Sequence, residues 1–196
     1  MDIAIPLFDR FTALDAIGPY EVLSRLPGHR VAFVAAHPGV RMTDNGMLGL
    51  VAEKAYSEIP NPEIVVVPGG IGTRAMMHDE ALIAWVRGAH ATSRFTCSVC
   101  TGSLVLGAAG ILDGLEATTH WASMELLRST GARPTARRVV EQDKVITGAG
   151  VSAGIDLALH MIGRMFGMEE ARAVAHYMMY RWAPEDEARA EALIAS

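Results

Sequence analysis

The amino-acid sequence predicts an α/β protein with one domain spanning residues 1–196. Three observations predict this class. Short apolar runs typical of buried parallel strands recur along the chain, stretches with helical spacing separate them, and 51% of the residues are hydrophobic, enough for one full core. Alternation of this kind is typical of a mainly parallel sheet with helices on both faces.

The expected core strands are runs of apolar and β-branched residues bounded by turn residues. The pair Asn45-Gly46 is a strong type I′ turn signal, and it indicates a small hairpin or tight loop before the next strand. Gln142-Asp143 is expected to join a second hairpin. The expected strands are Ile3–Leu7, His29–Ala36, Leu48–Val51, Ile64–Val67, Arg94–Val99, Arg138–Val140 and Lys144–Thr147.

The expected helices follow from apolar residues spaced three to four apart. Pro19 suits a first helical turn, and Gly110 suits the cap at a helix end. The expected helices are Thr12–Leu26, Asp79–Ala91, one from Cys100 to Gly110, Ser123–Ser129, one opened by Gly148–Val151 and running to about Met165, Glu169–Arg181, and Pro184–Ala195.

Charge and hydropathy narrow the class of partner. The net charge is -5 and no basic cluster is longer than Arg137-Arg138, which argues against a nucleic-acid or anionic-membrane surface. The first residues reach the polar Asp9 too soon for a signal peptide, and no apolar run approaches the ~20 residues of a membrane helix. We therefore expect a cytoplasmic protein that acts on a small molecule.

Cys100 is the first candidate for chemistry, because it follows a predicted strand and precedes a predicted helix. Unpaired N–H groups and the dipole at a helix start stabilise a thiolate. Gly102 and Ser103 are small, as a sharp turn between strand and helix requires. Cys100 is therefore expected to be a nucleophile, and the alternative is that it is simply a small buried side chain.

The second cysteine, Cys97, does not fit a redox pair with Cys100. Its position inside the strand directs its side chain to the opposite face from a residue three positions later, so dithiol exchange is not expected. Metal binding needs more ligands at suitable spacing, and His120 is the only nearby candidate. We expect no metal and no cofactor.

A glycine loop is the second candidate element. Gly69, Gly70, Ile71 and Gly72 follow a strand, at the edge where open α/β sheets bind ligands. Their N–H groups are expected to orient substrate or a developing anion, and the alternative is a plain turn. His120 is expected to line the site; whether it acts on the Cys100 thiol or only bonds backbone groups stays open.

Five blocks together resemble the ThiJ/PfpI superfamily, also called the DJ-one superfamily, over nearly the whole chain. They are Leu14–Val22, Val67–Gly72, Val99–Gly110, Ala117–Trp121 and Gly150–Asp156. The likeness is greatest to isocyanide hydratases and to the amidase-like domains of AraC-type regulators. It implies a flavodoxin-like sandwich related to class I glutamine amidotransferases, a homodimer, and a nucleophilic cysteine at the elbow.

For an isocyanide hydratase the resemblance further implies that Asp15 lies beside the Cys100 thiol and handles protons. The protease and deglycase branch typically has His after the nucleophile, where this chain has Thr101. Thr101 is expected either to hydrogen-bond the substrate or to cap the helix. The regulators carry a helix-turn-helix domain after this one, whereas a short acidic tail follows Arg181 here.

The expected activity is hydration of an isocyanide to an N-substituted formamide, with Asp15 supplying and recovering protons. Two alternatives stay open. One is a ligand or oxidative-stress sensor based on Cys100. The other is a different small-molecule activity of the superfamily, of the glyoxalase or amidase type.

Overall fold

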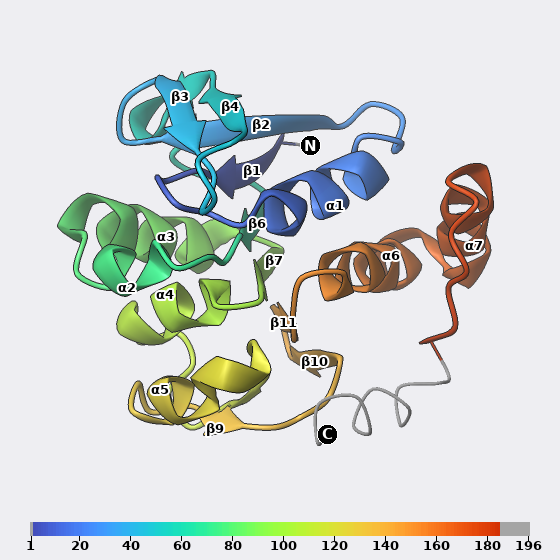
Figure 1. Ribbon diagram of the computed structural model, residues 1–196. Coiled ribbons are helices and arrows are strands. Elements are labelled where there is room, and N and C mark those ends of the chain that lie inside the picture. Colours follow the sequence, from blue (N-terminus) through green and yellow to red (C-terminus); the bar gives the residue numbers. More distant parts are fainter. Residues whose placement is uncertain (1, 185–196) are drawn as a thin grey trace.

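A seven-stranded sheet forms the centre of the structure (Figure 1), a computed structural model that describes residues 2–184. The strand order is β10-β11-β7-β6-β1-β2-β5. β10 is antiparallel to β11, and the other neighbouring strands are parallel. Their bounds are β1 Asp2–Pro6, β2 Arg30–Ala35, β5 Lys54–Ala55, β6 Ile64–Val67, β7 Phe95–Val99, β10 Val139–Gln142 and β11 Val145–Gly148.

Helices cover both faces of this sheet (Figure 1). One face carries α1 Ala13–Leu23, α6 Ala153–Phe166 and α7 Met168–Tyr177. The other face carries α2 Thr73–Met76, α3 Glu80–Thr92, α4 Gly102–Ala108 and α5 Met124–Arg128. The prediction of a flavodoxin-like α/β sandwich is confirmed.

Short elements complete the described chain. β3 Gly39–Met42 pairs with β4 Gly49–Ala52 as a hairpin outside the main sheet, and β8 Glu116–Ala117 pairs with β9 Arg133–Pro134. Two 3₁₀ turns occur, η1 Tyr56–Glu58 and η2 Trp121–Ser123.

The predicted strands are confirmed to within two residues at each end, but three predicted helix boundaries are wrong by three residues or more. The helix expected through Leu26 ends at Leu23. Gly148 was expected to open the long helix, yet it ends β11, where it pairs with Val99, and α6 begins only at Ala153. The helix expected through Arg181 ends at Tyr177. The hairpin indicated by Asn45-Gly46 is confirmed as the β3–β4 pair. No range was predicted for β3, and α2 was not predicted, because four residues carry too little pattern. The predicted helix Pro184–Ala195 lies outside the described residues but for its first residue.

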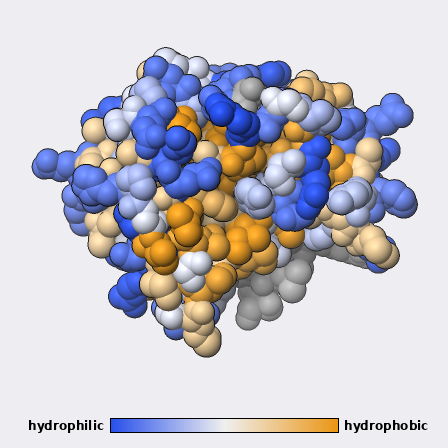
Figure 2. All heavy atoms as spheres, turned by 90° about the horizontal axis from the view of Figure 1, so that it is seen from above, coloured by the Kyte–Doolittle hydropathy of each residue, from blue (hydrophilic) through white to orange (hydrophobic). Residues whose placement is uncertain are grey.

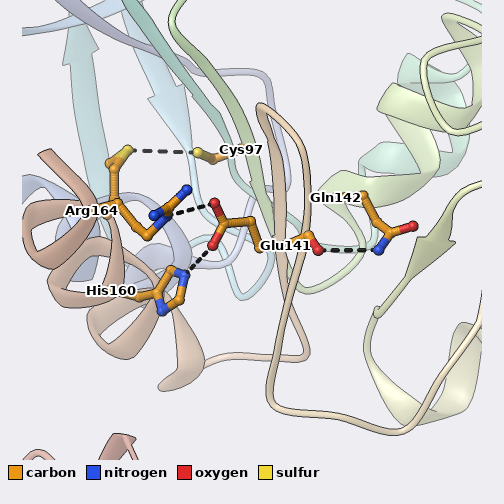
Figure 3. Close-up of polar contacts among 6 residues, drawn as sticks. Cys97, Glu141, Gln142, His160 and Arg164 are labelled. Carbon is orange, nitrogen blue, oxygen red and sulfur yellow. Dashed lines mark hydrogen bonds and ion pairs between the residues drawn. The ribbon is translucent and has the colours of Figure 1, made fainter.

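Polar and sulfur contacts join α6 to β10 and β7 (Figure 3). Glu141 on β10 accepts hydrogen bonds from His160 Nε2 and Arg164 Nε, both at 2.8 Å. The fully buried Cys97 thiol contacts Met161 Sδ at 3.8 Å. Burial raises the pKa of Cys97 far above its usual range, so this side chain is a packing thiol on the α6 face.

The topology places the candidate residues at one edge of the sheet. The chain passes from β1 outward to β2 and β5, and then returns to the other side of β1 through β6 and β7. Ligands bind in open α/β sheets at the carboxyl edge where this reversal occurs. The loops after β1, β6, β7 and β11 meet at that edge.

Candidate active site

Cys100 lies at a strained turn between β7 and α4. Its φ of 55° is in the left-handed region that side chains other than glycine rarely adopt. Its N–H donates to the carbonyl of Gly148 at 2.9 Å, and its carbonyl accepts from Ser103 Oγ at 3.2 Å and Thr119 Oγ1 at 3.0 Å. The hydrogen bond from Thr119 to the elbow was not predicted, although its block, Ala117–Trp121, is one of the five that carry the family resemblance. These three hydrogen bonds fix the backbone N–H and carbonyl groups of Cys100.

Gly102 allows the sheet to approach this elbow closely. A Cβ at Gly102 would lie 2.1 Å from the Val67 carbonyl oxygen and 2.9 Å from that of Pro68. No such contact is tolerated, so only glycine permits α4 to begin against the end of β6. This packing explains why the sharp turn needs a small residue at position 102, as the sequence indicated.

Asp15 comes to the same site from the first turn of α1. It is fully buried, and its Oδ2 accepts the Gly69 N–H at 3.0 Å. Oδ1 has no hydrogen-bond partner among the described residues. A buried carboxylate oxygen without a partner is costly in a folded protein, which points to a proton or a ligand at this position.

The Asp15 carboxyl and the Cys100 thiol shift one another's pKa. Burial, together with the charge of Asp44, raises the pKa of Asp15 to about 7, against the lowering effect of its contacts with Gly69 and Cys100. Burial and the neighbouring Asp15 charge raise the pKa of Cys100 to about 12, and contacts with Thr101 only partly offset this. Above pH 7 the pair therefore holds one proton, which lies on sulfur.

This differs from a thiolate stabilised at a helix start, which the sequence pattern favoured. Cys100 is 5% exposed, and α4 begins two residues later. Burial and Asp15 therefore outweigh the helix start, and the Cys100 side chain is a thiol beside the Asp15 carboxyl group.

Thr101 links the elbow to the glycine loop. Its hydroxyl accepts the Gly70 N–H at 2.9 Å and lies 3.0 Å from the Gly70 carbonyl oxygen. The side chain makes no capping hydrogen bond to α4. The N–H groups of Gly69 and Gly70 are thus bonded to Asp15 and Thr101, and Gly72 N–H donates to the Arg10 carbonyl at 3.1 Å. Ile71 is exposed at the tip of the loop.

His120 lies beside the thiol across Gly150. A Cβ at Gly150 would lie 3.7 Å from Cys100 Sγ and 3.3 Å from His120 Cδ2. His120 Nδ1 accepts the Ala122 N–H at 3.3 Å, and no hydrogen bond joins His120 to Cys100 within residues 2–184. Burial and the charge of Arg74 lower the pKa of His120, so its ring is neutral at pH 7.

Comparisons with known proteins show the family to which the chain belongs. The model of the DJ-1/PfpI family matches residues 1–164. The chain is 40% identical to isonitrile hydratase of Pseudomonas putida, over 94% of this chain and 80% of that protein. A ThiJ/PfpI family protein from Pseudomonas syringae superposes with a TM-score of 0.88 at 34% identity, covering 93% of this chain and 76% of that one.

The chain belongs to the DJ-1/PfpI family.

Other relatives show the breadth of this family. The chain is 26% identical to the HTH-type transcriptional regulator GbdR of Pseudomonas aeruginosa over 91% of its length, which covers 50% of the regulator. The fold also matches an AraC family transcriptional regulator from Pseudomonas putida with a TM-score of 0.77. Members of the DJ-1/PfpI family therefore include regulators as well as an enzyme.

A cavity of about 540 Å³, separate from the Cys100 elbow, opens over the carboxyl ends of β1 and β2. Its walls include Ile71 and Gly72 of the glycine loop and Arg74 of α2, but neither Cys100 nor Asp15.

Within the described part of the chain, no cluster of three or more His, Cys, Asp or Glu side chains is arranged to hold a metal ion. No helix there is long and apolar enough to span a membrane.

Proposed function

We propose that this protein hydrates an isocyanide to an N-substituted formamide, acting as a single-domain enzyme with Cys100 as nucleophile. The observation that carries the proposal is the buried Asp15 carboxyl beside the Cys100 thiol, with Oδ1 unpartnered among the described residues. The 40% identity to isonitrile hydratase supports the substrate class. No cofactor is needed for this reaction.

In the first step, the Cys100 thiol adds across the terminal carbon of R–N≡C. Asp15, ionised above its pKa of about 7, accepts the thiol proton as sulfur bonds to carbon. The same carboxyl then donates that proton to the carbon, which gives the thioimidate R–N=CH–S–Cys100. The proton is only transferred, so Asp15 is again a carboxylate.

In the second step, water resolves the thioimidate. Asp15 accepts a proton from water as the oxygen bonds to carbon, and it returns that proton to nitrogen. Collapse of the resulting R–NH–CH(OH)–S–Cys100 breaks the carbon–sulfur bond, and the hydroxyl proton passes to sulfur by way of Asp15. The products are R–NH–CHO and the free thiol, so atoms and charge balance.

The other site residues support this pair in the proposal. Thr101 and Gly70 hold the elbow against the glycine loop, and Gly69 N–H orients the carboxylate. Ile71 and Gly72 are proposed to contact the substrate, and His120 is a neutral side chain beside the sulfur. The raised pKa of Cys100 favours turnover with Asp15 over the alternative of an oxidation sensor, which needs an exposed thiolate.

A turnover assay tests the proposal. Purified protein is incubated with cyclohexyl isocyanide, and N-cyclohexylformamide is measured by chromatography. We expect turnover by the wild type and by Cys97→Ala, the matched cysteine control, and none by Cys100→Ala. Absence of formamide in the wild type, or equal rates in the wild type and Cys100→Ala, contradicts the proposal.

We further propose a homodimer in the cytoplasm. Two unpaired cysteines suit a reducing compartment. The outer face of the β3–β4 hairpin exposes Val40, Met42 and Val51, with Met47 at its tip, and apolar side chains gather in the middle of the face that Figure 2 shows. An apolar surface of this kind is typical of a protein interface, and a second copy of the chain is the proposed partner.

A further inference from the structure

The Arg74 guanidinium is a positive charge beside the turn that carries His120. Its Nη2 donates to Ser123 Oγ at 2.8 Å, and Ser123 N–H donates to the His120 carbonyl at 2.8 Å. Arg74 is therefore attached to the same turn that places His120 beside Cys100. Its charge reaches the site, since it helps to keep His120 neutral.

This guanidinium bonds only neutral groups within the described chain. Its acceptors there are the hydroxyls of Ser123 and Thr73, the latter at 3.4 Å, and no carboxylate of residues 2–184 lies within ion-pair distance. Arg74 also lines the cavity of about 540 Å³, so its side chain is half-buried but not sealed within protein. A guanidinium with spare N–H groups binds carboxylate in a bidentate manner.

A negative group, Asp15, and a positive group, Arg74, thus come from different elements. Asp15 comes from α1 and is bonded to Gly69 of the glycine loop. Arg74 comes from α2 and lies on the His120–Ser123 turn. In the proposal that follows, the substituent of an isocyanide that reacts at Cys100 extends along that turn towards Arg74.

We propose that Arg74 determines specificity by selecting isocyanides that carry a carboxylate, such as isocyanoacetate and its longer homologues. This inference rests on the proposed function. A neutral isocyanide reaches Cys100 as well, but without the ion pair. Arg74 binds the substituent and takes no part in proton transfer.

Two substrates of nearly equal size test the charge preference. We expect kcat/KM for isocyanoacetate or 3-isocyanopropionate to exceed that for the neutral methyl ester of the same acid. Arg74→Gln is expected to lower kcat/KM for the anion about tenfold, mainly through KM, and to leave the ester within about twofold. Arg74→Lys restores part of the preference. Arg30→Gln, which removes a guanidinium from the opposite edge of the sheet, is the matched control and keeps the wild-type ratio.

Alkylation of Cys100 separates this inference from the proposed function. Iodoacetate and iodoacetamide differ mainly in charge, and their rates with Cys100 are followed by protein mass, with Cys100→Ala as the blank. We expect the iodoacetate-to-iodoacetamide ratio to fall in Arg74→Gln and not in Arg30→Gln.

Each outcome decides one of the two proposals. If the neutral ester is turned over and Arg74→Gln changes both substrates alike, the inference is overturned and the proposed function stands. If no isocyanide is turned over but the alkylation ratio falls in Arg74→Gln alone, the effect of the Arg74 charge on anions that reach Cys100 stands and the proposed function fails.

Discussion

Asp15 combines full burial with the absence of any positive partner among the described residues. An ionised carboxylate in such surroundings is costly, and the raised pKa expresses that cost. The same feature gives Asp15 a pKa of about 7, which suits a group that both accepts and donates protons near neutrality. The burial of Asp15 therefore causes both its proposed role in proton transfer and its destabilising effect on the folded protein.

The pH dependence of kcat/KM should follow ionisation of Asp15. The carboxylate is the proton acceptor for the thiol, so activity is expected to rise through about pH 7 and then remain level to high pH. Asp15→Asn is expected to reduce kcat/KM by about a thousandfold or more and to abolish that limb. A wild-type limb well below pH 6 would instead indicate a thiolate acting alone.

Asp15 should also make stability depend on pH. Its folded pKa of about 7 lies above the ordinary value of 3.8, so the folded state binds more protons between these values. The free energy of unfolding contributed by Asp15 is therefore highest at low pH and falls as pH rises from about 4 to 7. At pH 8, Asp15→Asn is expected to have a free energy of unfolding higher than that of the wild type by on the order of 2 kcal/mol, measured by urea titration. The difference should shrink at pH 5, and an equal difference at both values would exclude this cause.

At the scale of elements, the site depends on how closely α4 and the glycine loop approach one another. The contacts of Gly102 with the end of β6 set this approach, and Thr101 fixes it with two contacts to Gly70. The strand-to-helix turn was predictable because a small residue is needed there. The use of the Gly69 and Gly70 N–H groups was not predictable, because it depends on long-range packing between segments that are remote in sequence.

Gly102→Ala should damage the elbow far more than an ordinary helix substitution. A methyl group 2.1 Å from the Val67 carbonyl oxygen must displace backbone, so we expect a loss of about 3 kcal/mol or more in the free energy of unfolding and loss of activity. Gly88→Ala on the exposed face of α3 is the matched control, since nothing lies within 4 Å of its new methyl. It should stabilise the protein by up to ~1 kcal/mol in urea titrations. Equal behaviour of the two variants would refute this view of the elbow.

At the scale of the whole molecule, the strand order brings four loops together at one edge while the β3–β4 hairpin projects outside the main sheet. The apolar runs predicted the core strands because burial on both faces leaves a strong pattern. The hairpin strand Gly39–Met42 alternates exposed and partly buried residues over only four positions, which is too short to detect. The sequence therefore indicated the hairpin turn at Asn45-Gly46 and its second strand, but not the first strand of the surface that we propose as the dimer interface.

The homodimer proposal predicts a concentration-dependent mass. Light scattering after gel filtration should give about twice the chain mass for the wild type at micromolar concentration. Val51→Lys places a charge on the apolar hairpin face and is expected to shift the protein towards monomer. Ala91→Lys, on the exposed end of α3, adds the same charge elsewhere and should remain a dimer. A monomeric wild type, or no change in Val51→Lys, would refute the interface.

The mass of the protein during turnover tests most directly whether Cys100 bonds the isocyanide carbon. Acid quench of the wild type with excess cyclohexyl isocyanide, followed by intact and peptide mass analysis, should reveal an adduct equal to the whole isocyanide on Cys100. We expect this thioimidate to disappear as the formamide accumulates, and Cys97→Ala to behave like the wild type. Steady formation of formamide with Cys100 never modified, or with the adduct on another residue, would contradict this expectation.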